Sequence, residues 1–170
     1  LYTTMLEIKL YHYHTDKIQP LLDIMGRQKL TNKDTISNVH TDYGQAEYTP
    51  QIVDILRQEL EQFGSDVGLQ QPYVSDAWFQ RYDNDSFHSP HNHGPVGYSS
   101  VLYLKYDPSV HGATRFIAPY LDVNGNTLEH SPDVRQGSII FFPSMLNHYV
   151  LPSKSDVTRI IMSMNIKEKA

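Results

Sequence analysis

The sequence predicts a mainly β protein in which an N-terminal helical layer supports an antiparallel β-sandwich or barrel, and we expect a jelly roll. Short β-rich runs, separated by clusters of Gly, Pro, Asn or Asp, occupy residues 73–82, 98–106, 113–118, 137–142 and 156–166. The chain also holds twelve tyrosines against one tryptophan, which favours sheets in which tyrosine rings pack and hydroxyls form hydrogen bonds.

A length of 170 residues suits one domain with a buried core. We expect a single domain over residues 1–170. Within it, residues 1–72 should supply the helical support and the first strand, and residues 73–166 the jelly-roll core.

The net charge of -5 and the lack of a basic run argue against nucleic-acid binding through phosphate neutralisation. The absence of cysteine excludes disulfides, thiolate metal ligands and thiol nucleophiles. No apolar run approaches the ~20 residues of a membrane span, and the first residues do not resemble a secretion signal. We therefore expect a soluble, cytoplasmic protein that does not bind membranes, with its oligomeric state left open.

The N-terminal region predicts a strand followed by a helix. Apolar side chains alternate along the segment Met5 to His14, with His12 and His14 continuing the same face, and this period is typical of a strand. A helical stripe follows, formed by Ile18, Leu21, Leu22 and Met25. Gly26 is expected to end this helix, and Pro20 to mark its true beginning.

Residues 27–48 are polar and aperiodic, so we expect a loop with one short element. Thr49 and Pro50 then predict a helix start, with the threonine as N-cap. An apolar stripe continues this helix until Gly64 ends it; its members are Ile52, Ile55, Leu56, Leu60 and Phe63.

Histidines predict a metal centre. His91 and His93 follow His88 in the sequence His-Ser-Pro-His-Asn-His-Gly, and His148 follows a later β-run after a turn at Pro143. Alternate residues of an extended strand project to the same side, and neutral imidazole is the commonest transition-metal ligand. Three imidazoles leave coordination positions open for a small molecule, which indicates a metalloenzyme. Zinc, copper, iron and nickel all suit imidazole, so the metal itself stays open.

Other aromatic and imidazole groups have plainer interpretations. The pair His12 and His14 has the same spacing as His91 and His93 but lacks a glycine or proline turn and a matched partner, so we expect no site there. His88 should be exposed on a loop, although a role beside the metal ligands is the alternative. Trp78 is expected to anchor the core rather than to form a substrate platform.

Arg159 begins the last β-run, and alternation places Arg159, Ile161, Ser163 and Asn165 on one face. Large apolar groups occur on both faces, so the strand should be covered on both sides. A buried guanidinium needs an anionic partner, since an unpaired buried charge is costly. That partner is either an acidic side chain of the protein or the carboxylate of a cosubstrate gripped by the planar guanidinium, with Ser163 as a helper donor.

Several runs together resemble the iron(II)/2-oxoglutarate-dependent oxygenases, above all their prolyl-hydroxylase-like branch and related phage and bacterial proteins. These runs are His-Asn-His, Gly-Ala-Thr-Arg-Phe, Gly-Ser-Ile-Ile-Phe-Phe-Pro before His148, and Arg-Ile-Ile-Met-Ser-Met-Asn. The resemblance covers about residues 73–166. It implies a double-stranded β-helix, the cupin-like jelly roll, and an enzyme that uses Fe(II), O2 and 2-oxoglutarate to hydroxylate a C–H bond.

Carried over by position, the resemblance implies that His91 and His148 bind iron. His93 stands where the family usually has aspartate, so iron is held either by three histidines or by two histidines and another group. Arg159 would bind the distal carboxylate of 2-oxoglutarate. Tyr82 and Tyr103 match tyrosines that line the cosubstrate pocket, and Ser163 lies four residues after the arginine, where many members have a serine at two.

Two other classes remain open. Cupins share the His-x-His pair and the later glycine, proline and histidine, but the glutamate that they usually add would fall at Gly97 or Tyr98, and they do not require Arg159. The protein would then be a cupin-type metal protein or an enzyme independent of 2-oxoglutarate. A carbohydrate-binding or virion jelly roll is the third class. The substrate, small or peptidyl and in the latter case a prolyl residue, would be selected by the loops at 83–90, 107–112 and 119–136, whose turn-forming sequences hold no readable specificity.

Overall fold

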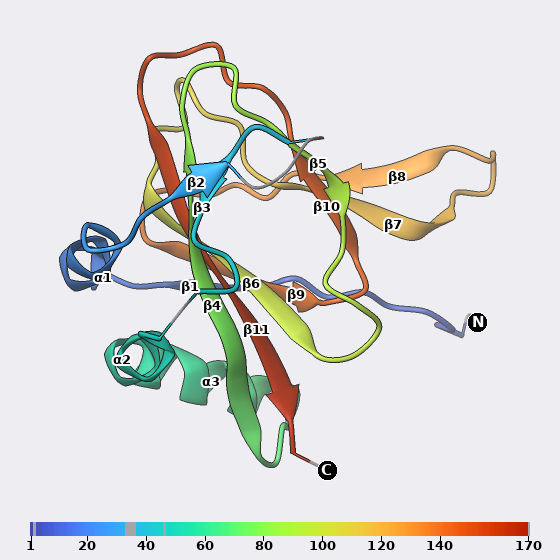
Figure 1. Cartoon of the computed structure of the whole chain (residues 1–170). Coiled ribbons are helices and arrows are strands. Elements are labelled where there is room, and N and C mark those ends of the chain that lie inside the picture. The colour runs from blue at the N-terminus through green and yellow to red at the C-terminus, as the bar shows by residue number, and fades with distance from the viewer. Residues whose placement is uncertain (2, 33–36, 46, 170) are drawn as a thin grey trace.

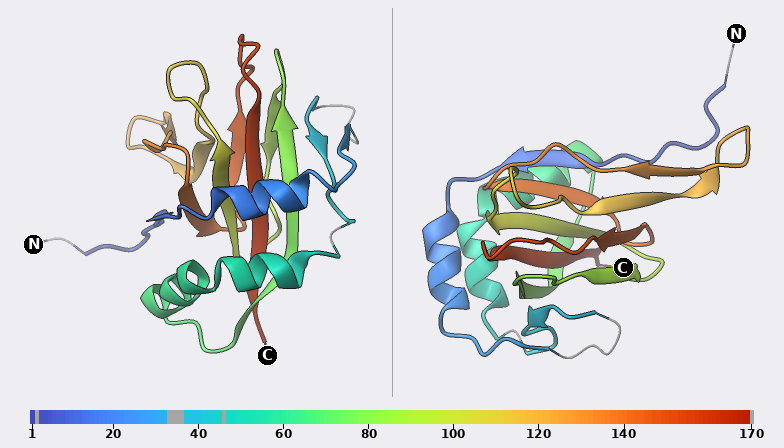
Figure 2. Two further views of the ribbon diagram at one scale, coloured as in Figure 1. Left: turned by 90° about the vertical axis from the view of Figure 1, so that its left-hand side faces the viewer. Right: turned by 90° about the horizontal axis from the view of Figure 1, so that it is seen from above.

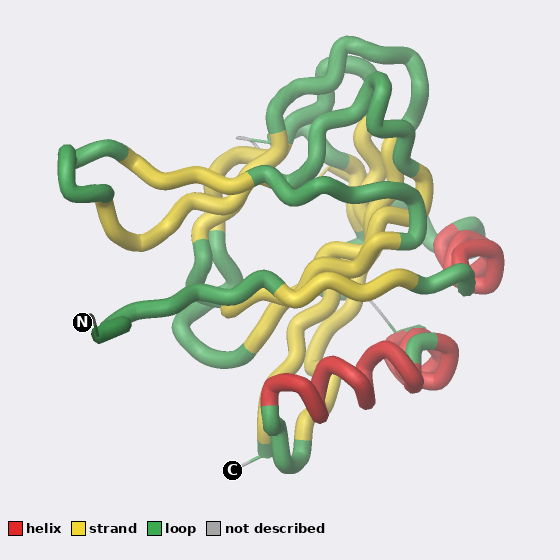
Figure 3. Tube along the Cα trace, turned by 180° about the vertical axis from the view of Figure 1, so that it is seen from behind, coloured by secondary structure: helices red, strands yellow, loops and turns green. Residues whose placement is uncertain are grey.

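The computed structural model describes residues 1, 3–32, 37–45 and 47–169. Two antiparallel sheets face each other, and the helices lie across the outer face of the larger sheet (Figures 1 and 2). Figure 3 shows the helices confined to one side of the strands. The predicted mainly β fold, a jelly roll supported by a helical layer, is confirmed. None of the described helices is long and apolar enough to cross a membrane.

The larger sheet has seven strands and the smaller sheet has four. In spatial order, the larger sheet consists of β1 (Tyr11–His14), β9 (Ser138–Pro143), β6 (Tyr98–Lys105), β11 (Arg159–Glu168), β4 (Pro72–Tyr82), β3 (His40–Thr41) and β2 (Thr31–Asn32). The smaller sheet consists of β5 (His88–His91), β10 (Asn147–Val150), β7 (Arg115–Leu121) and β8 (Thr127–His130). The hairpin of β7 and β8 projects away from the helices (Figure 1).

The alternation along β11 explains the two hydrophobic layers. Ile160, Met162 and Met164 point to the helices and join one buried cluster, whereas Ile161 faces the smaller sheet and joins a second. The strand is therefore covered on both faces, as its sequence predicts. Polar groups on the inner face, Arg159 and Ser163, are thus enclosed between the sheets.

The helices are α1 (Ile18–Met25), α2 (Thr49–Ile55) and α3 (Arg57–Val67). The predicted first helix is confirmed, but it begins two residues before Pro20, because N–H groups of a first turn need no intrahelical partner. The second prediction was wrong in detail. Tyr48 rather than Thr49 is the N-cap residue, the helix is interrupted at Leu56, and α3 continues through Gly64 to end at Gly68, whose φ of 82° suits glycine.

Several strand boundaries also differ from the sequence-based expectation. The first strand extends only over Tyr11–His14, where β9 provides hydrogen-bonding partners, and not from Met5. Strands β5, β8 and β10 lie in segments that lack an alternating pattern: β5 contains Pro90, β8 is exposed along its length, and β10 is short. The loop expected at residues 27–48 contributes β2 and β3 to the edge of the larger sheet.

Candidate active site

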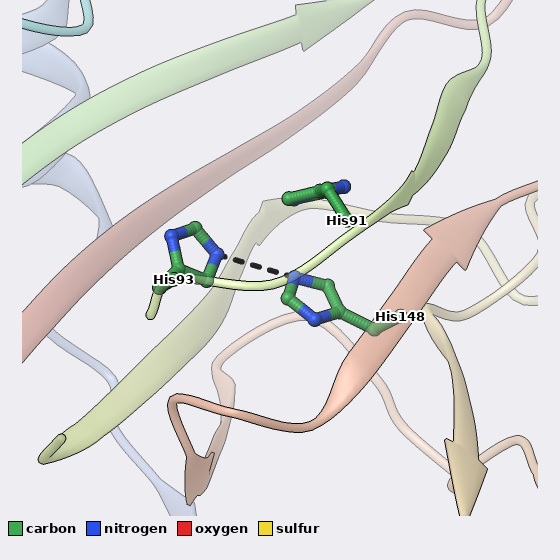
Figure 4. Close-up of side chains that lie close together, drawn as sticks. All are labelled: His91, His93 and His148. Carbon is green, nitrogen blue, oxygen red and sulfur yellow. Dashed lines mark hydrogen bonds between the residues drawn. The ribbon is translucent and has the colours of Figure 1, made fainter. Parts of the chain in front are cut away.

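Three histidines meet between the sheets, near the end of β5. His148 on β10 lies directly opposite His91 in the strand register, and His93 follows two residues after β5 ends. One ring nitrogen from each of the three lies within 4.8 Å of the others. Figure 4 shows His93 and His148 facing each other with His91 beside them. The three residues predicted from their spacing are therefore brought together.

Backbone carbonyls fix the orientation of two of these rings. Nδ1 of His91 lies 2.8 Å from the carbonyl oxygen of Ser89, and Nδ1 of His148 lies 2.9 Å from that of Leu146. A carbonyl can only accept, so both Nδ1 atoms carry the proton and donate it. The lone pair of each imidazole is then on Nε2, which is the arrangement typical of metal-ligating histidines.

The spacing of the ring nitrogens fits a metal ion. Nε2 of His93 and Nε2 of His148 are 3.2 Å apart. Two nitrogens bound to one metal at about 2.0–2.1 Å, at angles between octahedral and tetrahedral, are separated by roughly 2.8–3.4 Å. The observed separation falls inside that range, so the two rings need little movement to share an ion.

The protonation state of the cluster also favours metal binding. Burial lowers the pKa of His93 to about 4, helped by the neighbouring His91 and opposed by Asp76. Burial, with a further contribution from His91, lowers the pKa of His148 well below its usual value. Both imidazoles are therefore neutral at pH 7, and metal binding there displaces no proton from them.

A polar network holds the backbone at His93. Its N–H donates to the carbonyl oxygen of Ser144 at 2.8 Å. The Ser144 hydroxyl lies 2.8 Å from that of Ser99, which in turn donates to the side-chain oxygen of Asn165 at 2.8 Å. The ring of His93 is 5.4 Å from that of Trp78. His93 is thus positioned by both the larger sheet and the segment after β9.

Arg159 is the most unusual charged residue of the protein. Its side chain is 1% exposed, and no ion pair to a carboxylate involves it in the described part of the chain. One nitrogen, Nη2, donates to the Thr114 hydroxyl at 3.4 Å, while Nε and Nη1 are buried without a hydrogen-bond partner. An intramolecular salt bridge, the alternative considered from the sequence, is therefore not what holds this guanidinium.

Aromatic rings flank the guanidinium. Its central carbon lies 4.5 Å from the ring centre of Tyr82 and 5.5 Å from that of Tyr103. Burial raises the pKa of Tyr82 to about 12 against the opposing effect of Arg159, so its hydroxyl stays protonated. The Tyr103 hydroxyl accepts a hydrogen bond from the backbone N–H of Thr114 at 3.1 Å. The structure thus brings both predicted tyrosines to the predicted arginine.

A small inner cavity lies between the three histidines and the residues that contact Arg159. We use this name for the space lined by the histidine cluster together with Tyr82, Thr114, Ile161 and Ser163, the last being 4% exposed. Two of these residues, Tyr82 and Thr114, also contact Arg159. The guanidinium nitrogens without partners are donors that a carboxylate accepts from, and Tyr82 and Thr114 link Arg159 to the wall of the inner cavity.

A second hollow, the outer groove, lies on the other side of the histidines. It has a volume of about 340 Å³ and is lined by Val39, Thr41, Tyr43, Trp78, Gln80, His88, His91, Asn92 and His93. Tyr43 and Trp78 meet edge to face, with ring centres 4.9 Å apart. Trp78 is 3% exposed, as expected for a core anchor, yet it also borders this groove.

Several functional candidates escaped the sequence interpretation. His88 was expected on an exposed loop, but it is half-buried on β5 and stacks on His91, with ring centres 3.9 Å apart. Thr114 lies in the Gly-Ala-Thr-Arg-Phe run, which marked it without revealing its contact to Arg159. Gln80 and Tyr43 carried no detectable pattern, because they reach the groove only through the pairing of β3 with β4.

Comparison with known proteins also indicates an oxygenase. The family model described as "Putative 2OG-Fe(II) oxygenase" matches residues 76–165, which is more than half of the chain. No curated protein sequence matches the chain significantly.

Among solved structures, the chain is similar to a prolyl-4-hydroxylase of Pseudomonas putida, with 21% identity, a TM-score of 0.65, and coverage of 95% of this chain and 93% of that one. It is also similar to a viral collagen prolyl hydroxylase from Paramecium Bursaria Chlorella virus-1 in its 2-oxoglutarate complex, with 16% identity, a TM-score of 0.63 and coverage of 94% and 96%. A third is HygX from Streptomyces hygroscopicus, solved with nickel, 2-oxoglutarate and hygromycin B, with 10% identity, a TM-score of 0.66 and coverage of 94% and 83%.

At these identities the solved structures establish the shared fold, while the family match covers the strands that carry the histidine cluster and Arg159. The chain therefore belongs to the 2-oxoglutarate- and iron(II)-dependent oxygenases, non-haem iron enzymes that use 2-oxoglutarate and dioxygen.

Proposed function

We propose that the protein hydroxylates a prolyl residue of a peptide, with iron(II) held by His91, His93 and His148 and 2-oxoglutarate held by Arg159. One observation carries the assignment of the site. The buried guanidinium has two nitrogens without hydrogen-bond partners and lies beside the cavity that the three histidines line. A dicarboxylic keto acid supplies the anion that this guanidinium lacks and reaches the histidines with its other end.

Each side chain has a distinct task in this assignment. The histidines hold the metal through Nε2, and the carbonyls of Ser89 and Leu146 keep two of the rings in that tautomer. Arg159 orients the cosubstrate and neutralises its distal carboxylate. Iron(II), 2-oxoglutarate and dioxygen together supply the oxidising power for the C–H bond.

Further residues around Arg159 and in the wall of the inner cavity support cosubstrate binding. Tyr103 and Tyr82 hold the guanidinium from two sides, and Ser163 offers a hydroxyl to the bound cosubstrate. Ile161, on the same wall, is 2% exposed and helps to exclude water. Water exclusion strengthens the pairing between Arg159 and a carboxylate, because the local dielectric constant is low.

The outer groove supports a prolyl substrate. It borders the histidines directly, and none of its lining residues carries a carboxylate, ammonium or guanidinium group. The edge-to-face pair of Tyr43 and Trp78 offers an apolar corner to a compact, uncharged ring. Two of the similar structures are of prolyl hydroxylases.

The metal and cosubstrate assignments are tested by an anaerobic titration. Addition of iron(II) and then 2-oxoglutarate to the wild-type protein should produce the visible charge-transfer band of a chelated keto acid. The variant His148→Ala should lose metal and band together, whereas His12→Ala, which removes an exposed histidine from β1, should keep both. A wild-type protein that binds iron but shows no band with 2-oxoglutarate contradicts the assignment.

The substrate assignment requires a separate experiment. Proline-containing peptides incubated with the loaded enzyme should gain one oxygen atom, located on proline by fragment mass spectrometry. Tyr43→Ala should raise KM for the peptide and leave the 2-oxoglutarate titration unchanged, because Tyr43 borders only the outer groove. Oxygen incorporation into a small molecule or another residue type, with none into proline, would refute the prolyl assignment alone.

A further inference from the structure

One side chain lies between the two hollows of the active site and has no part in the roles described so far. His88 lines both the outer groove and the inner cavity. Gln80 and the ligands His91 and His93 share this position, so these four side chains form the partition between the two spaces. His88 also contacts Tyr82, whose ring packs on the guanidinium of Arg159.

Three neighbouring side chains, those of His91, Gln80 and Tyr82, contact His88 in the partition. Its ring stacks on that of His91, with the two planes inclined by 25°. Its Nδ1 lies 3.3 Å from Nε2 of Gln80 and 3.4 Å from the hydroxyl of Tyr82. The amide nitrogen can only donate and the tyrosine hydroxyl is protonated, so Nδ1 accepts from both and the ring carries its proton on Nε2. Both distances are long, so each of these two hydrogen bonds is weak.

The inner cavity is much smaller than a cosubstrate. Its volume is about 10 Å³, compared with about 340 Å³ for the outer groove. A space of about 10–15 Å³ accommodates one water molecule, and a five-carbon dicarboxylate is several times larger. If 2-oxoglutarate binds between the histidines and Arg159, as the proposed function requires, part of the cavity wall has to move.

The wall residues differ in how firmly they are held. Val101 and Ile161 belong to β6 and β11, which are hydrogen-bonded to strands on both sides, and both are buried in the core between the sheets. Tyr82 is 2% exposed and pinned beneath Arg159. His88 is half-buried and begins β5, an edge strand whose register with β10 shifts between His148 and Val150. The backbone beside His88 is tied by hydrogen bonds from the N–H groups of Phe87 and Ser89 to the side chains of Asn38 and Ser37, so opening here is a rotation of the His88 side chain, which borders the free volume of the outer groove, rather than a movement of the strand.

We propose that His88 is a residue of the cosubstrate site: its imidazole closes the chamber on the groove side and turns toward the groove when 2-oxoglutarate enters. The neighbouring groove has the volume to receive the ring. In the closed position His88 keeps the stack on His91 and the hydrogen bonds from Gln80 and Tyr82. These contacts are what the incoming cosubstrate has to break.

The test follows cosubstrate association in stopped-flow experiments on the iron(II)-loaded protein without oxygen. Two signals are available: the charge-transfer band, and the fluorescence of Trp78, the single tryptophan, which borders the groove. In the wild type, the observed rate should reach a plateau as 2-oxoglutarate is raised, because opening of the chamber becomes limiting. In His88→Ala, the rate should rise linearly and exceed the wild-type plateau by about tenfold, the factor expected from removing contacts of this strength.

Two further variants separate gating from support of the metal ligand. His88→Phe keeps a flat ring for the stack but accepts no hydrogen bond, so it should still show a plateau, at a higher rate than the wild type. His130→Ala removes an exposed histidine from β8 and should behave as the wild type. Metal content, measured in every variant, should stay at one iron per chain.

The results distinguish failure of the role proposed for His88 from failure of the proposed function. Identical linear rates in the wild type and both His88 variants would overturn the assignment of His88 and leave the proposed function standing. A loaded wild-type protein that binds no 2-oxoglutarate would overturn the proposed function, and the role of His88 with it. A His88→Ala protein that loses its iron, with a His88→Phe protein that has wild-type kinetics, would show that His88 only supports His91.

Discussion

The substitution Arg159→Met distinguishes two roles of the guanidinium, stabilisation of the fold and binding of 2-oxoglutarate. Methionine has a similar length and fills the same space without a charge. If Arg159 stabilised the fold through an ion pair, its removal would leave a buried carboxylate uncompensated. No such carboxylate pairs with it in the described chain, and two of its nitrogens lack hydrogen-bond partners.

The expected magnitudes follow from these contacts. Burial of the charge costs several kcal/mol. The two aromatic rings return about 2 kcal/mol each, and the bond to Thr114, which is long at 3.4 Å, returns about 1.5 kcal/mol, the low end for a hydrogen bond from a charged group. These terms nearly cancel, so the free energy of unfolding of the ligand-free protein should change by less than about 2 kcal/mol in either direction. Loss of the guanidinium from a buried pair with 2-oxoglutarate should instead cost about 2–5 kcal/mol, a rise in Kd of roughly 30-fold to several thousand-fold.

Thermal unfolding measures both effects in one experiment. At 2-oxoglutarate concentrations of 100 times Kd, the wild type should gain about 2.7 kcal/mol, which raises Tm by about 5–10 °C for a chain of this size. Arg159→Met should show a Tm close to the wild type without ligand and, because a Kd raised 30-fold or more leaves at most about 0.9 kcal/mol of stabilisation, a ligand shift of less than about 4 °C. Arg135→Met, a change at an exposed arginine, should keep the full shift. A ligand-free variant destabilised by more than about 4 kcal/mol, or one that keeps the full ligand shift, would refute the reasoning.

Three further predictions concern the ligands and the scaffold. His93→Asp should retain iron and bind it about tenfold or more tightly in the absence of 2-oxoglutarate, because a carboxylate adds a negative charge to a neutral donor set; iron affinity measured by chelator competition checks this, and complete loss of iron would contradict it. In chelator, His93 should contribute about 3 kcal/mol to the fall in the free energy of unfolding between pH 7 and pH 4, since its folded-state pKa is lowered from 6.5 to about 4 and the unfolded chain takes up the proton first as pH decreases; His148, whose pKa is also lowered, adds to the fall in both proteins, so urea unfolding should show a fall about 3 kcal/mol smaller in His93→Gln than in the wild type. Gly137→Ala should destabilise the fold by about 2–4 kcal/mol, because its φ is 89° and a Cβ would overlap the carbonyl of Thr15, whereas Gly112→Ala, with open space around it, should change stability by less than about 0.5 kcal/mol.

The parts of the fold that the sequence predicts are those with a strong period. Strands β4, β6, β9 and β11 bury alternate side chains in two different clusters, and their runs of apolar residues stand out. Strands β5, β8 and β10 belong to a sheet that is partly exposed or irregular, and their sequences carry no period. Their positions depend on long-range pairing, which no local pattern encodes.

In the active site, too, some residues can be predicted from the sequence and others cannot. His91, His93, His148 and Arg159 are detectable because residue type alone suggests their chemistry: clustered imidazoles and a charge in an apolar strand. His88 shares the residue type, but Pro90 makes its segment an unfavourable strand sequence, and the stacking on His91 occurs where the register of β5 with β10 is irregular.

Because the proposed metal ligands are neutral, the metal dication and Arg159 both lack a negative partner within the described part of the protein. In a centre with one carboxylate ligand, the protein itself compensates part of the charge of the metal dication. In the proposed centre the three ligands are imidazoles, and Arg159 adds a further positive charge near the same cavity. In a low-dielectric space, this concentration of positive charge is unfavourable until a dianion enters. In the proposed site 2-oxoglutarate pairs with both cations at once, so its binding and that of the metal should strengthen each other reciprocally. A partition that excludes water from this space, as we propose for His88, increases the coupling, because each charge then depends more on its partner than on solvent.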